Sequence, residues 1–306
     1  MSDSRKPVVV VGSVTMDMVT VTPQIPRIGQ TVIGTSFGTT PGGKGANQAV
    51  AAARLGYPVH MVGKVGQDVY GPALLDNLAS SGVITTAMEQ VDGPSGLAPI
   101  FLSETGENAI VVVPGANGHV DSATVDRHAA LIRSAGMVLC QLELPIATVS
   151  YVLALCAEAA VPVMLDPAPA AVLPDPFWSQ LAWFTPNETE AAFYLNDQSK
   201  PEDAAEHFLD RGLKGVVLKR GAEGSYVAVA AGKGAWVSAF KVNAIDTVGA
   251  GDCFNGAFAV ALLEDQDPWA AARFASAASA ISVTRRGAQA SMPSRAEVDA
   301  FLAEHS

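Results

Sequence analysis

Several familiar signatures are missing from this 306-residue chain. Its three cysteines, Cys140, Cys156 and Cys253, form no CxxC pair, which is typical of reduced thiols in a cytosolic protein. The five histidines show no metal-ligand spacing, and no GxSxG elbow occurs. A GxxxxGKS/T loop is absent too, so the sequence excludes a P-loop nucleotide-binding protein.

Positive charge and long apolar runs are also scarce. Lysine and arginine number 19 against 30 aspartates and glutamates, which gives a formal net charge of -11. Such an acidic surface repels phosphate backbones and anionic lipid. The apolar run near the start, Val8–Val11, is too short for a signal or membrane segment. We therefore expect a cytoplasmic protein that binds neither nucleic acid nor membranes.

The chain does contain an alternation of apolar runs and helical patterns. Continuous apolar runs are typical of strands buried on both faces, and they occur at Pro7–Val14, Val59–Val62, Met137–Gln141, Val161–Leu165 and Gly215–Lys219. Helical patterns occupy Lys44–Leu55, Tyr70–Ser81, Ala147–Ala159, Ala250–Leu263 and Trp269–Val283. The alternation predicts one α/β domain over residues 1–306, with a mainly parallel central sheet covered by helices on both sides.

Two stretches, Asp17–Phe37 and Gly96–Val113, break this alternation because they have strand composition without intervening helices. Turn-forming residues at 103–108 lie between two apolar runs and predict a hairpin. Antiparallel strands that project from a parallel core predict a small lid, built from about residues 15–40 and 95–114.

Two glycine-rich segments each open a predicted helix. In the first, PGGKGANQ at 41–48, the glycines let the backbone come close to another group, and Lys44 and Asn47 offer donors to a hydroxylated ligand. A turn that merely tolerates glycine is the alternative interpretation.

The second segment is DTVGAGDCFNG at 246–256. Small residues at a helix N-terminus allow an anion to approach the unpaired N–H groups. Asp252, in the first turn, either stabilises the helix dipole or accepts a proton from an attacking hydroxyl beside that anion.

Both segments resemble signatures of the PfkB carbohydrate kinase family, and GGKGANQ resembles its ribokinase branch. Five further matching pieces follow the family's order: Gly12-Ser13, Gln141-Leu142-Glu143, Pro167–Ala170, Thr185–Glu190 and Val283–Gln289. The resemblance runs nearly end to end and implies a ribokinase-like three-layer sandwich with a small antiparallel β lid. It further implies ATP-dependent phosphorylation of D-ribose to D-ribose 5-phosphate with Mg²⁺, a monovalent-cation activator (K⁺), and a homodimer joined through the lid.

The resemblance also implies roles for individual residues. Asp252 resembles the catalytic base, beside an anion hole formed by Gly249, Ala250 and Gly251. The sugar-contacting positions are Thr15, Asp17, Gly43, Lys44, Gly45, Asn47, Glu143 and Asp252 itself. The ATP-contacting positions are Asn187, Lys219, Arg220, Gly221, Ala222, Glu223, Gly224, Gly251 and Ser276. Glu190 is linked to Mg²⁺, and the monovalent-cation loop matches Asp246, Val248, Ser282, Arg285, Gly287 and Ser291.

Two positions depart from the ribokinase pattern. Thr15 stands where asparagine is common, two residues before Asp17, and Lys219-Arg220 stands where Thr-Leu is usual. The first departure keeps 2-deoxyribose or a related sugar open as the substrate. A nucleoside kinase and a non-catalytic sugar-binding regulator are further alternatives.

Overall fold

The computed structural model describes residues 5–195, 200–230 and 232–305. Within them, nine strands form one sheet in the order β13-β12-β11-β10-β9-β8-β1-β4-β5. Pairing is parallel from β5 to β11 and antiparallel at the β12–β13 edge, which confirms the predicted mainly parallel sheet. The bounds are β1 Val8–Val11, β4 Val59–Gly66, β5 Ile84–Val91, β8 Met137–Cys140, β9 Val163–Leu165, β10 Trp183–Phe184, β11 Gly215–Lys219, β12 Ser225–Val229 and β13 Ala235–Val237.

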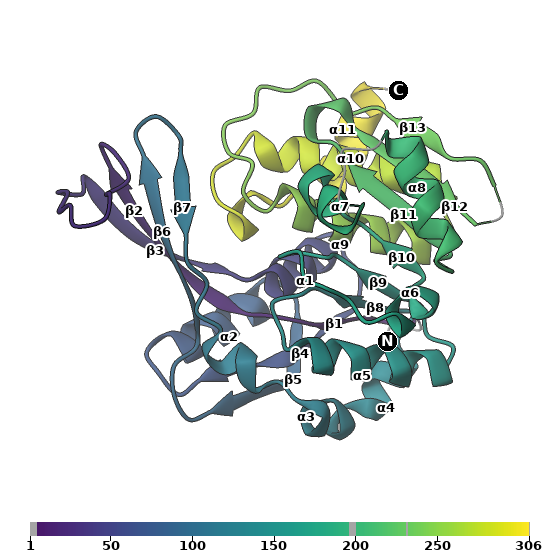
Figure 1. The fold of residues 1–306 in the computed structure, drawn as a ribbon, viewed down its shortest axis with the longest axis horizontal. Helices are drawn as coiled ribbons and strands as arrows, with labels where there is room; N and C mark the ends of the chain where they lie inside the picture. The colour runs from purple at the N-terminus through teal and green to yellow at the C-terminus, as the bar shows by residue number, and fades with distance from the viewer. Residues whose placement is uncertain (1–4, 196–199, 231, 306) are drawn as a thin grey trace.

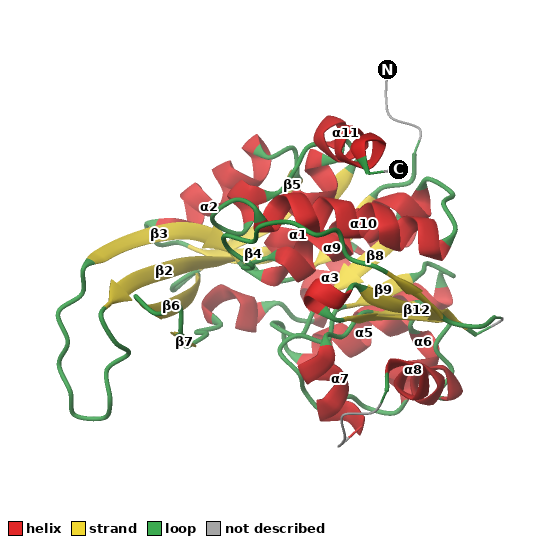
Figure 2. Ribbon diagram, turned by 90° about the horizontal axis from the view of Figure 1, so that it is seen from above, coloured by secondary structure: helices red, strands yellow, loops and turns green. Residues whose placement is uncertain are grey.

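Helices cover both faces of this sheet (Figure 2). Val8 and Val10 of β1 pack into one core with helices α1, α2, α9 and α10, while Val9 and Val11 pack into a second core with α3 to α8. Successive strand side chains point to opposite faces, so a strand covered on both sides needs an unbroken apolar run. The helices are α1 Lys44–Arg54, α2 Tyr70–Ser80, α3 Ser122–Arg127, α4 Ala129–Ser134, α5 Ile146–Glu158, α6 Pro176–Gln180, α7 Glu188–Leu195, α8 Pro201–Asp210, α9 Ala250–Leu263, α10 Pro268–Val283 and α11 Arg295–Glu304.

A second, smaller sheet stands out from the body of the molecule (Figure 1). Its strands run in the order β3-β2-β6-β7, with β2 at Thr15–Thr22, β3 at Ser36–Gly42, β6 at Gly96–Ser103 and β7 at Asn108–Ile110. The β2–β3 and β6–β7 pairs are antiparallel, and a parallel β2–β6 pairing joins them.

The predicted hairpin is confirmed, since β6 pairs with β7 across the turn at 104–107. The prediction of strand over Asp17–Phe37 is correct only at its ends, because residues 23–35 form a loop. Pro23, Pro26 and Gly29 lie in that loop, and proline cannot donate to a strand ladder.

The carboxyl ends of β1, β8, β9 and β11 meet at one edge of the main sheet, because these strands run in the same direction. Open α/β sheets bind their ligands at this edge. β2 continues from β1 at the same edge, so the small sheet begins where a ligand would lie. Among the described helices, none is long and apolar enough to cross a membrane.

Candidate active site

Asp252 lies in the first turn of α9 and is buried. The helix begins after Gly249, whose φ of 75° is left-handed. A side chain there would also collide with Ala288, whose Cβ lies 2.9 Å from where a Cβ of residue 249 would be. Glycine therefore allows the chain to turn sharply into α9 and places Asp252 at the helix N-terminus.

Two consecutive residues of α1 hold the Asp252 carboxylate. Asn47 Nδ2 donates to Oδ2 at 2.9 Å, and Gln48 Nε2 donates to Oδ1 at 3.1 Å. Burial raises the pKa of Asp252 to about 6, against the opposing effect of Lys44 and these hydrogen bonds. The two glycine-rich segments, separated by about 200 residues in sequence, thus meet at one carboxylate.

The sugar-contacting candidates gather at the start of α1 and the base of the small sheet. Thr15 Oγ1 donates to Asp17 Oδ1 at 2.9 Å, and burial raises the pKa of Asp17 to about 6. The Lys44 amide donates to Glu143 Oε2 at 3.0 Å, so Glu143 satisfies an unpaired N–H at the helix N-terminus. Burial opposes the charge of Lys44, but the surrounding carboxylates, Asp252 foremost, outweigh it and raise its pKa.

Gly43 explains why this segment is rich in glycine. Its φ is 91°, and a Cβ there would lie 2.8 Å from the Thr15 backbone nitrogen. Gly45 is equally confined, with its missing Cβ 2.5 Å from the Ser13 nitrogen. The start of α1 is therefore pressed against the β1–β2 connection, which brings Lys44 close enough to act on Asp17.

The nucleotide-side candidates begin at the end of β11, where Lys219 Nζ donates to Asp166 Oδ1 at 2.9 Å. Asp166 is buried and follows β9 directly. Sequence reasoning missed it, although an acid placed just after a short buried strand was a usable signal. Gln48, also missed, donates to the other oxygen of Asp166 at 3.0 Å.

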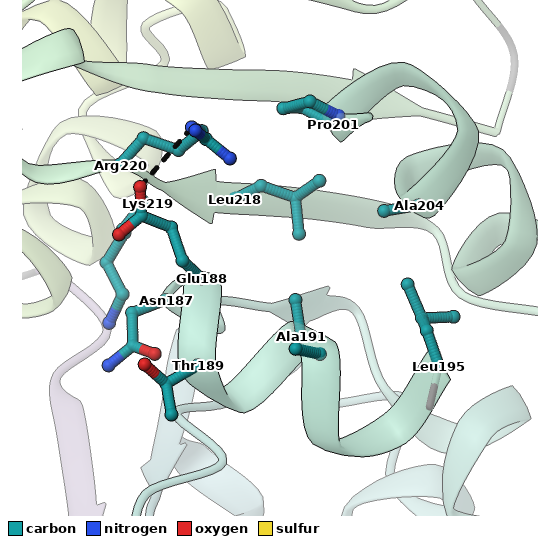
Figure 3. Close-up of a pocket in the computed structure, with 11 residues that line it drawn as sticks. Asn187, Glu188, Thr189, Ala191, Leu195, Pro201, Ala204, Leu218, Lys219 and Arg220 are labelled. Carbon is teal, nitrogen blue, oxygen red and sulfur yellow. Dashed lines mark ion pairs between the residues drawn. The ribbon is translucent and has the colours of Figure 1, made fainter. Parts of the chain in front are cut away.

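Beyond Lys219 a pocket of about 460 Å³ opens between α7, α8 and β11 (Figure 3). Asn187, Lys219 and Arg220, which the family resemblance assigns to the ATP site, line it. Arg220 is paired with Glu188 at 3.4 Å and with Glu223 at 3.1 Å. The other candidates of this loop form a short 3-10 turn and the residue after it, Gly221, Ala222, Glu223 and Gly224.

Asn187 and Glu190 hold each other at the start of α7. The Asn187 amide and Nδ2 donate to the two Glu190 oxygens at 2.8 and 3.0 Å, and Asn187 Oδ1 accepts from the Glu190 amide at 2.9 Å. This reciprocal arrangement is a helix capping box. Burial and then Asp166 raise the pKa of Glu190. The NxxE pattern thus has a structural role whether or not it also serves a metal.

The predicted cation loop brings two segments together around Asp246. Its carboxylate accepts from the Val248 amide at 3.0 Å and from the Gly287 amide at 2.8 Å. Arg285 is paired with Glu297 at 2.6 Å, and its Nη1 reaches the Ser291 carbonyl at 3.5 Å. Among the described residues, no cluster of three or more His, Cys, Asp or Glu could hold a metal ion. Two more predicted residues, Ser276 and Ser282, are buried in α10.

An ionisable carboxylate at a helix N-terminus, where unpaired N–H groups favour anions, is suited to a phosphotransferase that acts on a hydroxyl group. The sequence model of the pfkB family carbohydrate kinases matches residues 5–295, and the chain belongs to this family.

Relatives of known function are similar over nearly the whole chain. The ribokinase of Bacillus subtilis is 45% identical over 298 residues, 96% of this chain and 98% of the relative. The deoxyribokinase of Salmonella typhi is 36% identical over 301 residues, again 96% and 98%. A solved structure of Arabidopsis thaliana ribokinase complexed with ribose and ATP covers 97% of this chain and 99% of that one, with a TM-score of 0.92 and 33% identity.

Proposed function

We propose that this protein transfers the γ-phosphoryl group of ATP to the 5-hydroxyl of D-ribose, with Asp252 as the general base. The observation that carries the proposal is the place of this carboxylate. It is buried between the sugar-contacting candidates of α1 and the nucleotide-side pair Asp166–Lys219, at a helix N-terminus suited to a phosphate. The similarity to ribokinases supports ribose as the substrate.

The reaction needs no reactant other than ATP and the sugar. The sugar hydroxyl oxygen forms a bond to the γ-phosphorus while the bond from that phosphorus to the β–γ bridging oxygen breaks, and ADP leaves. Asp252 takes the hydroxyl proton. A pKa of about 6 keeps the carboxylate mostly ionised at neutral pH and makes it a better base than an ordinary aspartate.

The first amides of α9 would stabilise charge on the transferring group. In this structure the Ala250 N–H donates to the Thr247 carbonyl at 3.2 Å, so this amide exchanges one partner for another when it serves the anion hole. Gly251 keeps the approach to the helix open because it has no side chain. The sugar would be held by Asp17, Lys44 and Asn47.

Mg²⁺ fits the oxygen donors of this site. The ion usually takes one or two carboxylates together with substrate phosphates and water. Asp166 lies close enough to Glu190 to raise its pKa, and Lys219 interacts with both carboxylates. These two carboxylates would hold the ion, which supplies charge neutralisation to the phosphates when bound.

An ADP-release assay over pentoses, hexoses and nucleosides tests the function. Ribose is expected to give the highest kcat/KM, and phosphorus NMR of the product should show phosphate on the 5-hydroxyl. Turnover confined to nucleosides or hexoses would refute the assignment, and no turnover with any sugar would favour a non-catalytic sugar-binding protein.

A kinase for 2-deoxyribose is the second candidate because of Thr15. The hydroxyl group of this buried side chain donates its hydrogen bond to Asp17, so it would not donate to a sugar 2-hydroxyl. The 36% identity to a deoxyribokinase is consistent with this reading. The ratio of kcat/KM for ribose to that for 2-deoxyribose, measured in the parent and in Thr15→Asn, decides between the two sugars.

We also propose that a second copy of this chain covers the small sheet. Large apolar side chains are exposed on its strands, such as Phe37 at 61% and Ile110 at 53%, and on the loop between β2 and β3, such as Ile33 at 83%. Exposed apolar patches on a projecting sheet with two free edges favour self-association. Light scattering should give a dimer for the parent and a monomer for Phe37→Asp. The control is Val172→Asp, an exposed apolar residue outside this sheet, which should stay dimeric.

A further inference from the structure

Gln48 lies at the centre of the site and is 1% exposed. Its Nε2 donates to Asp252 at 3.1 Å and to Asp166 at 3.0 Å, while its Oε1 accepts from Gln141 Nε2 at 2.7 Å. Both ends of the amide are therefore fixed. The orientation is unambiguous, because two acceptor carboxylates require the nitrogen end and the Gln141 donor requires the oxygen end.

This single amide group connects the two sides of the site. Asp166 in turn is bound by Lys219, whose Nζ donates to Asp166 Oδ1 at 2.9 Å. The same Nζ lies 3.4 Å from the position that a Cβ on Gly251 would take, so the ammonium group sits over the start of α9. A continuous path, Asp252–Gln48–Asp166–Lys219, thus leads from the proposed base to an ammonium group at the start of α9.

We propose that Gln48 is a positioning residue for phosphoryl transfer: its amide fixes the orientation of the Asp252 carboxylate and ties the base to Lys219 through Asp166. This inference rests on the function proposed above. Two buried carboxylates that share one donor would repel each other without it, and a buried charge that loses a donor becomes costly. Removing the amide should let Asp252 rotate and hold its proton more tightly.

Other charges also act on Asp252 and must be considered in any titration. Lys44 of α1 favours the ionised carboxylate, whereas Asp166 disfavours it. Asp17 of β2 interacts with Asp252 from the base of the small sheet, and Glu143 acts on both Asp17 and Lys44. Lys219 of β11 and Glu190 of α7 lie on the far side of Asp166. A substitution at Gln48 leaves these groups in place, but it removes one donor from Asp166 as well as from Asp252.

The main test is Gln48→Met, which keeps the length of the side chain and removes its donor. We expect kcat to fall about tenfold at pH 7 because the base is misplaced, while the KM values for ribose and ATP change little. The acid limb of the kcat/KM profile should move up by about one pH unit, the loss expected for one hydrogen bond to a charged group.

Two further variants separate positioning from general loosening of the core. Asp166→Asn has the same shape and removes a like charge, so the acid limb should move down, opposite to the effect of Gln48→Met. Gln141→Met is the matched control, because Gln141 is equally buried but touches neither carboxylate. Its acid limb should move by less than a third of the Gln48→Met shift. Equal shifts in the two glutamine variants would overturn the proposal.

A readout that needs no substrate keeps the inference distinct from the proposed function. Carbon-13 NMR of labelled aspartate carboxyls reports the titration of Asp252 directly, with its signal assigned by loss in Asp252→Asn. An inactive parent protein would sink the proposed function and leave this titration measurable. If Gln48→Met does not fold, the smaller and uncharged Gln48→Leu must still raise the pKa of Asp252. An unchanged Asp252 titration in the folded Gln48 variant refutes the positioning role.

Discussion

The two sides of Asp252 are built differently. On the sugar side Ser13, Thr15, Asn47 and Gln48 are all buried, and their polar groups are joined by hydrogen bonds. On the nucleotide side Asn187, Glu188 and Glu223 are exposed, and Arg220 is held by surface ion pairs. Buried hydrogen bonds fix a geometry, whereas exposed pairs of this kind contribute little and exchange partners easily.

This difference indicates how each ligand would be recognised. A small sugar offers only hydroxyl groups, so its selection requires donors and acceptors that are already in place. A triphosphate brings several charges of its own, which can displace weak surface pairs as it binds. Substitutions on the sugar side should therefore alter specificity and the chemical step, and those on the nucleotide side should alter binding of ATP.

The largest effect is expected where the two sides meet. Asp252→Asn removes the base and keeps the shape of the side chain, with one oxygen left to accept from either Asn47 or Gln48. We expect kcat to fall by roughly two to four orders of magnitude, the usual contribution of general base catalysis. Single-turnover rates in the purified, folded variant measure this, and near-normal turnover would show that another group takes the proton.

The sugar side can be isolated with Asp17→Ala. We expect kcat/KM for ribose to fall about 100-fold, because a site built to bind hydroxyl groups loses a charged acceptor. The KM for ATP should change little, since Asp17 belongs to β2 and Lys219 to β11. Titration calorimetry with ribose alone and with ATP alone separates the two effects. Equal weakening of both ligands would contradict the division into two sides.

Much of this site was predictable from sequence, and the reason is local. Gly43 and Gly249 have left-handed backbone conformations, and Gly45 leaves no room for a Cβ beside the Ser13 nitrogen. Glycine at a left-handed position and an acid in a first helical turn are signals of short range. The strands β1, β8 and β9 were likewise visible as apolar runs because both faces of each are buried.

The parts that sequence reasoning missed depend on contacts between distant segments. The assignment of Asn47 to the sugar stays a prediction, but the sequence did not indicate that its amide donates to Asp252 and accepts from Gln289, 242 residues away. Asp166 gained meaning only when Lys219 and Gln48 were placed beside it. The edge strand β13 was missed because a three-residue strand with two exposed residues carries little apolar pattern. Strand β12 was missed although it is buried and lies between β11 and β13.

The nucleotide side can be isolated in the same way with Lys219→Met. We expect kcat/KM for ATP to fall about tenfold, since the site loses one charge-assisted contact to phosphate. Ribose binding in the absence of ATP should stay as in the parent. Lys219→Arg is the matched control and should keep most of the activity, because it preserves the charge beside Asp166. Weaker ribose binding with normal ATP affinity in Lys219→Met would contradict the assignment of this lysine to the nucleotide side.

The pH dependence of the phosphorylation rate should be set by two buried carboxylates, Asp17 and Asp252. Burial raises the pKa of Asp17 and of Asp252 to about 6. Asp252 must be ionised to accept a proton, and Asp17 binds hydroxyl groups more strongly when it is ionised. Activity is therefore complete well above pH 6 and lost as the pH falls through it. At pH 5.5 a single such group leaves about a quarter of the rate at pH 8, and two groups leave less. A rate that stays flat down to pH 5 would show that neither carboxylate has a raised pKa.

The smallest effect should come from the loop around Asp246, which lies on neither side. We propose that the carbonyls of this loop and of residues 282–291 bind a monovalent cation, as the family resemblance implies. Asp246 already ties the two segments through the Val248 and Gly287 amides, and the loop leads directly into the α9 N-terminus. A cation there would fix the anion-hole amides without touching either substrate.

We expect potassium to raise kcat a few-fold over a large organic cation at equal ionic strength, with both KM values nearly constant. Asp246→Asn should weaken this activation, and identical rates with both cations would exclude the site.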